Sequence, residues 1–144
     1  MKQTIEIVAV SSLIHASREK VWKTLVTPSL IKQWLFNTNA QSDWYVGSAI
    51  TFAGEWKGKP YRDKGKIISI EPNTLLRHTF WSANSGKPES PENYVTVTYT
   101  IEEKGELSEL VITQSGVESE KELHHLEENW NKILGGIKRV AESL

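Results

Sequence analysis

The sequence predicts a single α+β domain in which one long C-terminal helix covers a curved antiparallel sheet of about seven strands. Three observations predict this class. Segments rich in Val, Ile and Thr alternate with turn residues from Trp44 to Ser115, which is typical of antiparallel strands. A continuous helical stripe of apolar residues then runs from residue 119 to about residue 142. No linker, repeat or low-complexity tract divides the chain, so we expect residues 1–144 to form one domain.

The N-terminal part is predicted to hold one strand and two short helices. The expected elements are a strand at 5–14, a helix at 18–26, a second helix starting at Pro28 and a polar loop at 37–43. Ser17 is a typical N-cap for the first helix. Thr27 and Pro28 end that helix and begin the second, because Pro is favoured at the first position of a helix.

Six further strands are predicted between the second helix and the C-terminal helix, at 44–46, 49–54, 61–71, 75–82, 93–103 and 107–115. The alternation is clearest in 93–101, where Val95, Val97 and Tyr99 share one face with Ile101 and threonines occupy the other. Such a strand has one buried and one wet face. The loop at 82–92 is rich in Pro and Ser, and we expect it to be mobile.

The C-terminal helix has a clear start and an unusual interior. Ser119 with Glu122 three residues later forms a capping-box signature. The apolar stripe comprises Leu123, Leu126, Trp130, Ile133, Leu134, Ile137 and Val140. Gly135 and Gly136 interrupt it, and each costs about 1 kcal/mol relative to alanine in a helix interior.

Composition excludes several classes of function. Seventeen Lys and Arg residues against eighteen Asp and Glu residues give a formal net charge of −1. This balance provides no field to attract nucleic acid or anionic lipid, so neither is expected as a partner. The absence of cysteine excludes disulfides and thiolate catalysis. The first ten residues do not resemble a signal peptide, and no apolar run approaches the roughly 20 residues that span a bilayer. We therefore expect a cytoplasmic protein without membrane insertion.

We expect no cofactor and no metal ion. The segment from Gly54 to Lys59 resembles a phosphate-binding loop, but its spacing is one residue short and Pro60 replaces the required Ser or Thr. His124 and Glu128 share a helix face, whereas His125 points about 100° away. A metal would need a third ligand from elsewhere, so we interpret these residues as part of a polar helix face.

The aromatic residues predict a cavity between the sheet and the long helix, since apolar walls with a few polar groups are typical of small-molecule pockets. The predicted lining residues are Trp34, Trp44, Phe52, Tyr61, His78, Phe80, Tyr99, Leu126, Trp130 and Leu134. Trp22 and Trp130 lie on helical apolar stripes and are expected to anchor helices to the sheet, and Trp81 is a further candidate for the rim.

Two residues allow alternative interpretations. His78 shares a strand face with Leu76 and Phe80. It either binds a ligand or acts as an acid or base, or it is a histidine at the core edge whose hydrogen bonds are satisfied by a hydroxyl group such as that of Tyr99 or by water. Trp56 lies at a predicted hairpin end. It is either a contact surface or flap over the pocket, or an edge residue folded back onto the sheet.

The order of these motifs resembles a known superfamily. Residues 14–22, IHASREKVW, resemble the opening of the START-like, birch-pollen-allergen-like (SRPBCC) helix-grip proteins, and LIKQWL at 30–35 resembles their second short helix. Residues 43–52, 65–72 and the helix around Trp130 resemble the branch named after the C-terminal domain of the activator of the heat-shock protein 90 ATPase. Asn129 stands where these proteins often have glycine.

The resemblance implies a helix-grip fold whose cavity binds a small, largely hydrophobic molecule such as a lipid, sterol or polyketide. It implies no shared catalytic residues, so we expect binding without catalysis. One alternative is a protein-interaction module, related to chaperone regulation or forming a homodimer, that uses Trp56 and the loop at 82–92. Another is an enzyme of the cyclase or hydrolase kind with His78 as base.

Overall fold

The computed structural model describes residues 7–144 and places seven strands of that range in one antiparallel sheet. The strands are β1 (Ile7–Ile14), β2 (Asn39–Ser42), β3 (Ala49–Trp56), β4 (Lys59–Glu71), β5 (Leu75–Phe80), β6 (Val95–Lys104) and β7 (Leu107–Ser115). The helices are α1 (Arg18–Val26), α2 (Pro28–Trp34) and α3 (Glu120–Glu142), with short 3₁₀ turns η1 (Ala83–Ser85) and η2 (Pro91–Asn93). The predicted α+β class and its element order are confirmed.

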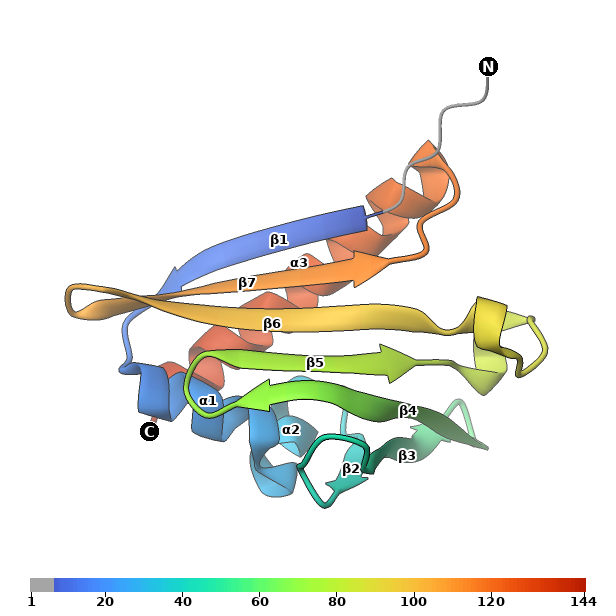
Figure 1. Cartoon of the computed structure of the whole chain (residues 1–144), viewed down its shortest axis with the longest axis horizontal. Coiled ribbons are helices and arrows are strands. Elements are labelled where there is room, and N and C mark those ends of the chain that lie inside the picture. Colours follow the sequence, from blue (N-terminus) through green and yellow to red (C-terminus); the bar gives the residue numbers. More distant parts are fainter. Residues whose placement is uncertain (1–6) are drawn as a thin grey trace.

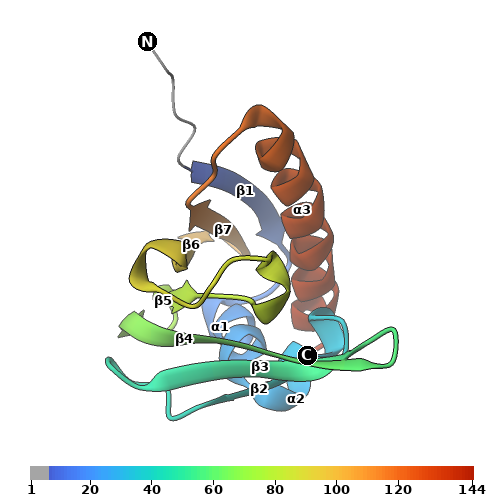
Figure 2. The same ribbon diagram turned by 90° about the vertical axis from the view of Figure 1, so that its right-hand side faces the viewer.

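The sheet has the order β1-β7-β6-β5-β4-β3-β2 and curves around α3 (Figures 1 and 2). Helix α3 crosses one face of the sheet, whereas α1 and α2 lie at one end of it (Figure 1). The buried core lies between the sheet and these helices, with Ile14, Leu110 and Ile137 completely enclosed. This arrangement gives the sheet a covered concave face and an open convex face.

The region around residue 40 differs from the prediction. The predicted loop at 37–43 contains β2, and the predicted strand at 44–46 is a turn. Strand β2 pairs with β3 through Ala40 opposite Phe52. Its polar composition, Asn-Ala-Gln-Ser, hides this edge strand, because only Ala40 is fully buried within it. Residues 5 and 6 of the predicted first strand lie outside the described residues.

The predicted helix starts are confirmed in α1 and α3. The Ser17 hydroxyl oxygen accepts a hydrogen bond from the Lys20 N–H at 3.2 Å, and Ser119 accepts one from the Glu122 N–H at 3.1 Å. Thr27 is the N-cap of α2, but its side chain makes no capping hydrogen bond. Its carbonyl instead accepts from the N–H groups of Leu30 and Ile31 at 2.9 Å.

The two helix glycines differ in their surroundings. A Cβ atom at Gly136 would lie 3.2 Å from the Cβ atom of Trp34, so Gly136 lets α2 and α3 approach closely. A Cβ atom at Gly135 would meet no atom within 4 Å. The contact with α2 therefore accounts for Gly136 but not for Gly135.

We expect Gly135→Ala to raise the free energy of unfolding by about 1 kcal/mol, because alanine restricts the unfolded chain and fits the helix without a clash. Urea unfolding of the purified protein measures this change. Gly136→Ala is the matched control, and we expect it to be less favourable than Gly135→Ala because its methyl group presses on Trp34. Equal gains from both substitutions would contradict the packing explanation.

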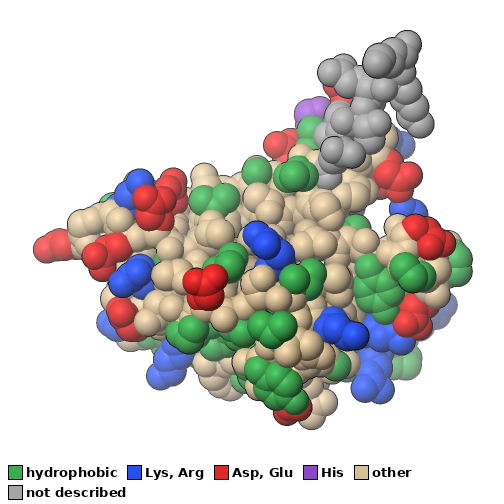
Figure 3. Space-filling view, in the orientation of Figure 1, with side chains coloured by type: hydrophobic (Ala, Val, Ile, Leu, Met, Phe, Trp, Pro, Cys, Tyr) green, Lys and Arg blue, Asp and Glu red, His purple; other side chains and the backbone are tan. Residues whose placement is uncertain are grey.

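The convex face of the sheet carries charges of both signs scattered among apolar side chains (Figure 3). No single basic or acidic field covers this face, which agrees with the balanced net charge of −1. Among residues 7–144, no helix has the length and apolar character that a membrane crossing requires.

Candidate functional site

A cavity of about 590 Å³ opens between the sheet and α3. Seven of the ten predicted lining residues surround it, namely Phe52, Tyr61, His78, Phe80, Tyr99, Leu126 and Trp130. The remaining lining residues are Leu35, Phe36, Thr38, Glu55, Trp56, Asp63, Asn84, Val97, Gln114, Asn129, Lys132 and Ile133. This volume lies within the range of roughly 300–1,000 Å³ that is usual for small-molecule pockets.

Strand alternation explains how the sheet supplies its share of the lining. Successive side chains in a strand point to opposite faces, so every second residue faces α3. In β5 these are Leu76, His78 and Phe80, as predicted, and in β6 they include Val97 and Tyr99. Of these inward residues, Leu76 is packed in the core, whereas the cavity is bordered by His78, Phe80, Val97 and Tyr99.

Three predicted lining residues lie outside the cavity. Trp34 is only 6% exposed, and its indole N–H donates to the Thr24 carbonyl at 2.8 Å, so it joins α2 to α1. Leu134 is buried in the hydrophobic core and does not line the cavity. Trp44 is half-buried against the core from a turn, where its φ of 58° replaces the predicted strand conformation.

His78 lies at the inner wall of the cavity and is 2% exposed. Its Nδ1 lies 2.8 Å from the Thr79 carbonyl oxygen. A carbonyl only accepts hydrogen bonds, so Nδ1 carries the proton and Nε2 keeps a free lone pair. Burial lowers the pKa of His78 to about 4, against the opposing effect of the hydrogen bond to Thr79. The imidazole is therefore neutral at pH 7 and offers an acceptor.

The partner of His78 differs from the predicted one. The predicted hydroxyl of Tyr99 does not hold it, and the rings of His78 and Tyr99 instead stack with their centroids 6.0 Å apart. Phe52 packs against the same imidazole at 5.8 Å and against Phe80 at 5.8 Å. This aromatic surrounding removes water from His78, which is the cause of its low pKa.

The Thr79 carbonyl that contacts His78 lies where β5 pairs with β4, between the Lys64–Trp81 bridge and the Ile67–His78 pair. The Lys66 N–H donates to the Thr79 hydroxyl at 2.9 Å. A Cβ atom at Gly65 would overlap the Thr79 carbonyl oxygen. Gly65 therefore makes room for the carbonyl that fixes the tautomer of His78.

Asp63 is a polar lining residue that the sequence interpretation missed. Its Oδ1 atom is buried and accepts no hydrogen bond from the described residues. Burial raises the pKa of Asp63, while hydrogen bonding from Ser82 and from the Ala83 backbone lowers it. Strand parity was the available signal, since Asp63 follows Tyr61 by two residues in the predicted strand at 61–71 and so shares its face.

On the α3 side of the cavity, Trp130 connects the helix to the sheet. Its indole N–H donates to the Gln114 side-chain oxygen at 2.8 Å, and its ring meets the edge of Tyr99 at a centroid distance of 6.2 Å. Burial also raises the pKa of Tyr99, so its phenol is neutral. Trp130 thus has both predicted roles, because it anchors the helix and lines the cavity.

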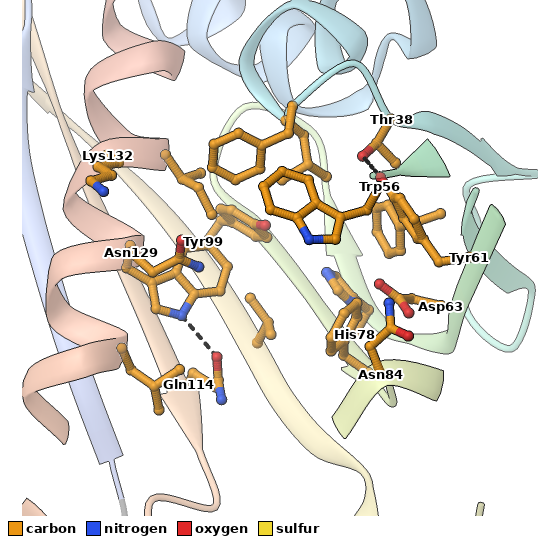
Figure 4. A pocket seen from close by; sticks show the side chains of 18 of the residues that line it. Thr38, Trp56, Tyr61, Asp63, His78, Asn84, Tyr99, Gln114, Asn129 and Lys132 are labelled. Carbon is orange, nitrogen blue, oxygen red and sulfur yellow. Dashed lines mark hydrogen bonds between the residues drawn. The ribbon is translucent and has the colours of Figure 1, made fainter. Parts of the chain in front are cut away.

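Trp56 occupies the mouth of the cavity at the end of β3. It lines the cavity and is nevertheless 63% exposed, so the alternative of an edge residue folded back on the sheet is wrong. The hairpin turns at Lys57 and Gly58, which both have positive φ, as a two-residue hairpin turn requires. Figure 4 shows the Trp56 indole projecting toward the cavity.

The other two tryptophans lie elsewhere. Trp22 packs against the core from α1, as predicted. Trp81, a predicted rim residue, does not line the cavity, and its indole N–H donates to the Lys87 carbonyl at 3.2 Å. The loop that follows Trp81 is held to β4 by an ion pair between Lys64 and Glu89 at 2.8 Å.

The histidines of α3 form no ligand cluster in the described range. Within residues 7–144, no group of three or more His, Asp or Glu residues is placed to hold a metal ion. His124 faces Glu127, with its Nδ1 atom 3.6 Å from Oε1, and its side chain is exposed. It belongs to the polar face of the helix.

A curved antiparallel sheet that encloses a cavity with a long C-terminal helix defines a protein of the helix-grip class, a ligand-binding fold. The family model described as "Activator of Hsp90 ATPase homolog 1-like protein" matches residues 15–142, and the chain belongs to this family. The predicted SRPBCC-type superfamily and its branch are thereby confirmed. None of the curated proteins matches the chain.

Solved structures share the fold over nearly the whole chain. The solution structure of ChR145 from Cytophaga hutchinsonii is 42% identical with a TM-score of 0.86, and the match covers 99% of this chain and 97% of that one. The Aha1 dimer from Colwellia psychrerythraea is 22% identical with a TM-score of 0.73, and covers 96% and 97%. CalU16 from Micromonospora echinospora is 18% identical with a TM-score of 0.73, and covers 97% and 87%.

Proposed function

We propose that the chain binds a small, largely hydrophobic molecule in the cavity between the sheet and α3, without catalysis. The observation that carries the proposal is the cavity of about 590 Å³, whose walls are mainly aromatic and aliphatic side chains. Burying the apolar surface of a ligand there contributes about 25 cal/mol per Å². The seven predicted residues that line the cavity are proposed to contact the ligand, whereas Trp34, Trp44 and Leu134 lie outside it.

Native mass spectrometry of the purified protein tests the proposal directly. We expect a co-purifying molecule, or binding of the neutral apolar dye N-phenyl-1-naphthylamine, whose fluorescence rises in apolar surroundings. The proposal fails if the protein carries no molecule and binds neither this dye nor a panel of lipids, sterols and aromatic compounds.

We expect Trp56→Ala to weaken dye binding about tenfold, because an indole that covers a bound molecule contributes roughly the burial energy of one aromatic contact. Isothermal titration calorimetry measures the dissociation constant without relying on tryptophan emission. Tyr45→Ala is the matched control, since Tyr45 is 59% exposed and lies away from the cavity. Equal affinities in the two variants would remove Trp56 from the site.

An enzymatic role for His78 is disfavoured by its surroundings. A general base works best when its pKa lies near the working pH, and the pKa of His78 is about 4. Its Nδ1 proton is already donated to Thr79, so only Nε2 faces new partners. We therefore propose an acceptor role for this imidazole rather than a catalytic one.

We propose a protein-interaction function as the second candidate. Trp56 and the loop at 82–92 would carry it, and a homodimer is one form of it. Trp56 already has an explanation at the cavity mouth, whereas no other described contact singles out a protein partner. A pull-down compared with the Trp56→Ala variant distinguishes the two functions, because a lost protein partner would favour the interaction module.

A further inference from the structure

We propose that the ligand of this cavity carries a hydrogen-bond donor, such as a hydroxyl or amino group, that Asp63 and His78 accept where β4 and β5 form the wall. The inference rests on the proposed function and names the chemical class of the ligand. That class is a largely apolar molecule with a donor group, as distinct from a fully apolar molecule or a carboxylic acid.

Asp63 and His78 belong to the same part of the cavity. Asp63 is paired in register with Phe52, and the Phe52 ring lies 5.8 Å from the His78 ring. Figure 4 shows Asp63, His78 and Asn84 gathered on one side of the cavity, with Asn129 and Lys132 across from them on α3. Both residues therefore face the same side of the cavity.

His78 presents an acceptor and no donor to this space. Its Nδ1 proton is occupied by the Thr79 carbonyl at 2.8 Å, which leaves the Nε2 lone pair for a ligand. The imidazole is 2% exposed and packed between aromatic rings, so water has little access to it. A buried acceptor is stabilised when it receives a hydrogen bond, and a donor on the ligand supplies one.

Asp63 presents a second acceptor in the same place. Its Oδ1 atom is buried and receives no hydrogen bond from the described residues. The neighbouring Lys64 is engaged by Glu89 at 2.8 Å, and alternation places it on the other face of β4. Lys132 lies across the cavity on α3 (Figure 4).

The other polar lining groups of β4 do not compete for the donor. The hydroxyls of Tyr61 and Thr38 hydrogen-bond to each other at 2.6 Å. A negatively charged ligand group would be repelled by Asp63 and would meet no donor on His78. Asp63 Oδ1 and His78 Nε2 accept but do not donate, so together they select a ligand that brings the proton.

The test compares 2-naphthol with 2-methoxynaphthalene, two ligands with the same ring system of which only the first has a donor. The ether has one more methyl group, so apolar burial alone predicts tighter binding of the ether. We expect the wild-type protein to bind 2-naphthol about tenfold more tightly at pH 7, because a hydrogen bond to a charged acceptor is among the stronger ones. Titration calorimetry gives both dissociation constants.

Asp63→Asn removes the charged acceptor and is expected to reduce the preference for 2-naphthol to about twofold or less, since a hydrogen bond to a neutral group contributes less. Asp43→Asn is the matched control at the chain's other aspartate, which is exposed and lies outside the cavity. It is expected to keep the wild-type preference. Thermal unfolding of each variant confirms that it is folded.

Binding of the ether as tight as that of 2-naphthol overturns the donor inference and leaves the proposed function intact. The same holds for tighter binding of 2-naphthoate, or for a preference that persists unchanged in Asp63→Asn. Failure of all three compounds and of the apolar dye to bind overturns the proposed function, and this inference with it.

Discussion

Gly65→Ala is expected to destabilise the protein by about 3 kcal/mol, the upper part of the usual range for overpacking. The new methyl group would overlap the Thr79 carbonyl oxygen, which is backbone and has no flexible end that can move aside. Relief requires the separation of β4 from β5 beside Thr79. The shifted carbonyl would also lose the Nδ1 proton of His78.

The midpoint of urea-induced unfolding measures this loss. Lys66→Ala is the matched control, because Lys66 is exposed on the same strand and its side chain is expected to change the stability by less than about 0.5 kcal/mol. An unchanged midpoint for Gly65→Ala would show that β4 accommodates a side chain there. The close approach of Gly65 to Thr79 would then have no structural consequence.

The protein is expected to lose about 3 kcal/mol of stability between pH 6.5 and pH 4 through His78 alone. Its pKa is about 4 in the folded protein and about 6.5 in the unfolded chain, and one pKa unit corresponds to about 1.4 kcal/mol. The unfolded chain binds a proton in this window whereas the folded protein does not, so acid favours unfolding. The stabilising contribution is complete above pH 6.5.

Comparison of the wild-type protein with His78→Gln isolates this contribution, since the raised pKa of Asp63 acts with the opposite sign as the pH falls. Unfolding free energies measured at half-unit pH steps should show a steeper decline for the wild type than for His78→Gln. His124→Gln serves as the matched control at an exposed histidine. Parallel curves for the wild type and His78→Gln would contradict a buried, neutral imidazole.

Gly65, the Thr79 carbonyl and His78 form one local arrangement beside the cavity. The absence of a side chain at Gly65 in β4 leaves room for the Thr79 carbonyl of β5, and this carbonyl orients the imidazole of His78. The glycine, the carbonyl and the histidine come from residues 65, 79 and 78, and no sequence pattern links the glycine to the histidine. This arrangement connects the pairing of β4 with β5 to the hydrogen bonding of His78 in the cavity wall. A substitution at Gly65 is therefore expected to alter ligand binding as well as folding.

Patterns of burial were readable from the sequence because they repeat. The period-two alternation of β5 placed His78 on the inner face, and the stripe of α3 placed Leu126 and Trp130 toward the sheet. Serine caps marked the starts of α1 and α3. Strand β2 was not predicted, because an edge strand with one buried residue, Ala40, shows no alternation of apolar and polar residues.

Local periodicity and the order of motifs along the chain were enough to predict the fold class, the inner faces of the strands and the family. Which inward residues are packed and which border the cavity became clear from the three-dimensional packing alone. Trp34 fills the gap between α1 and α2, while Trp130 borders the cavity, although both are tryptophans on helices. The physical reason is that a cavity is bounded by elements far apart in sequence, and their separation is set by contacts such as that of Gly136 with Trp34.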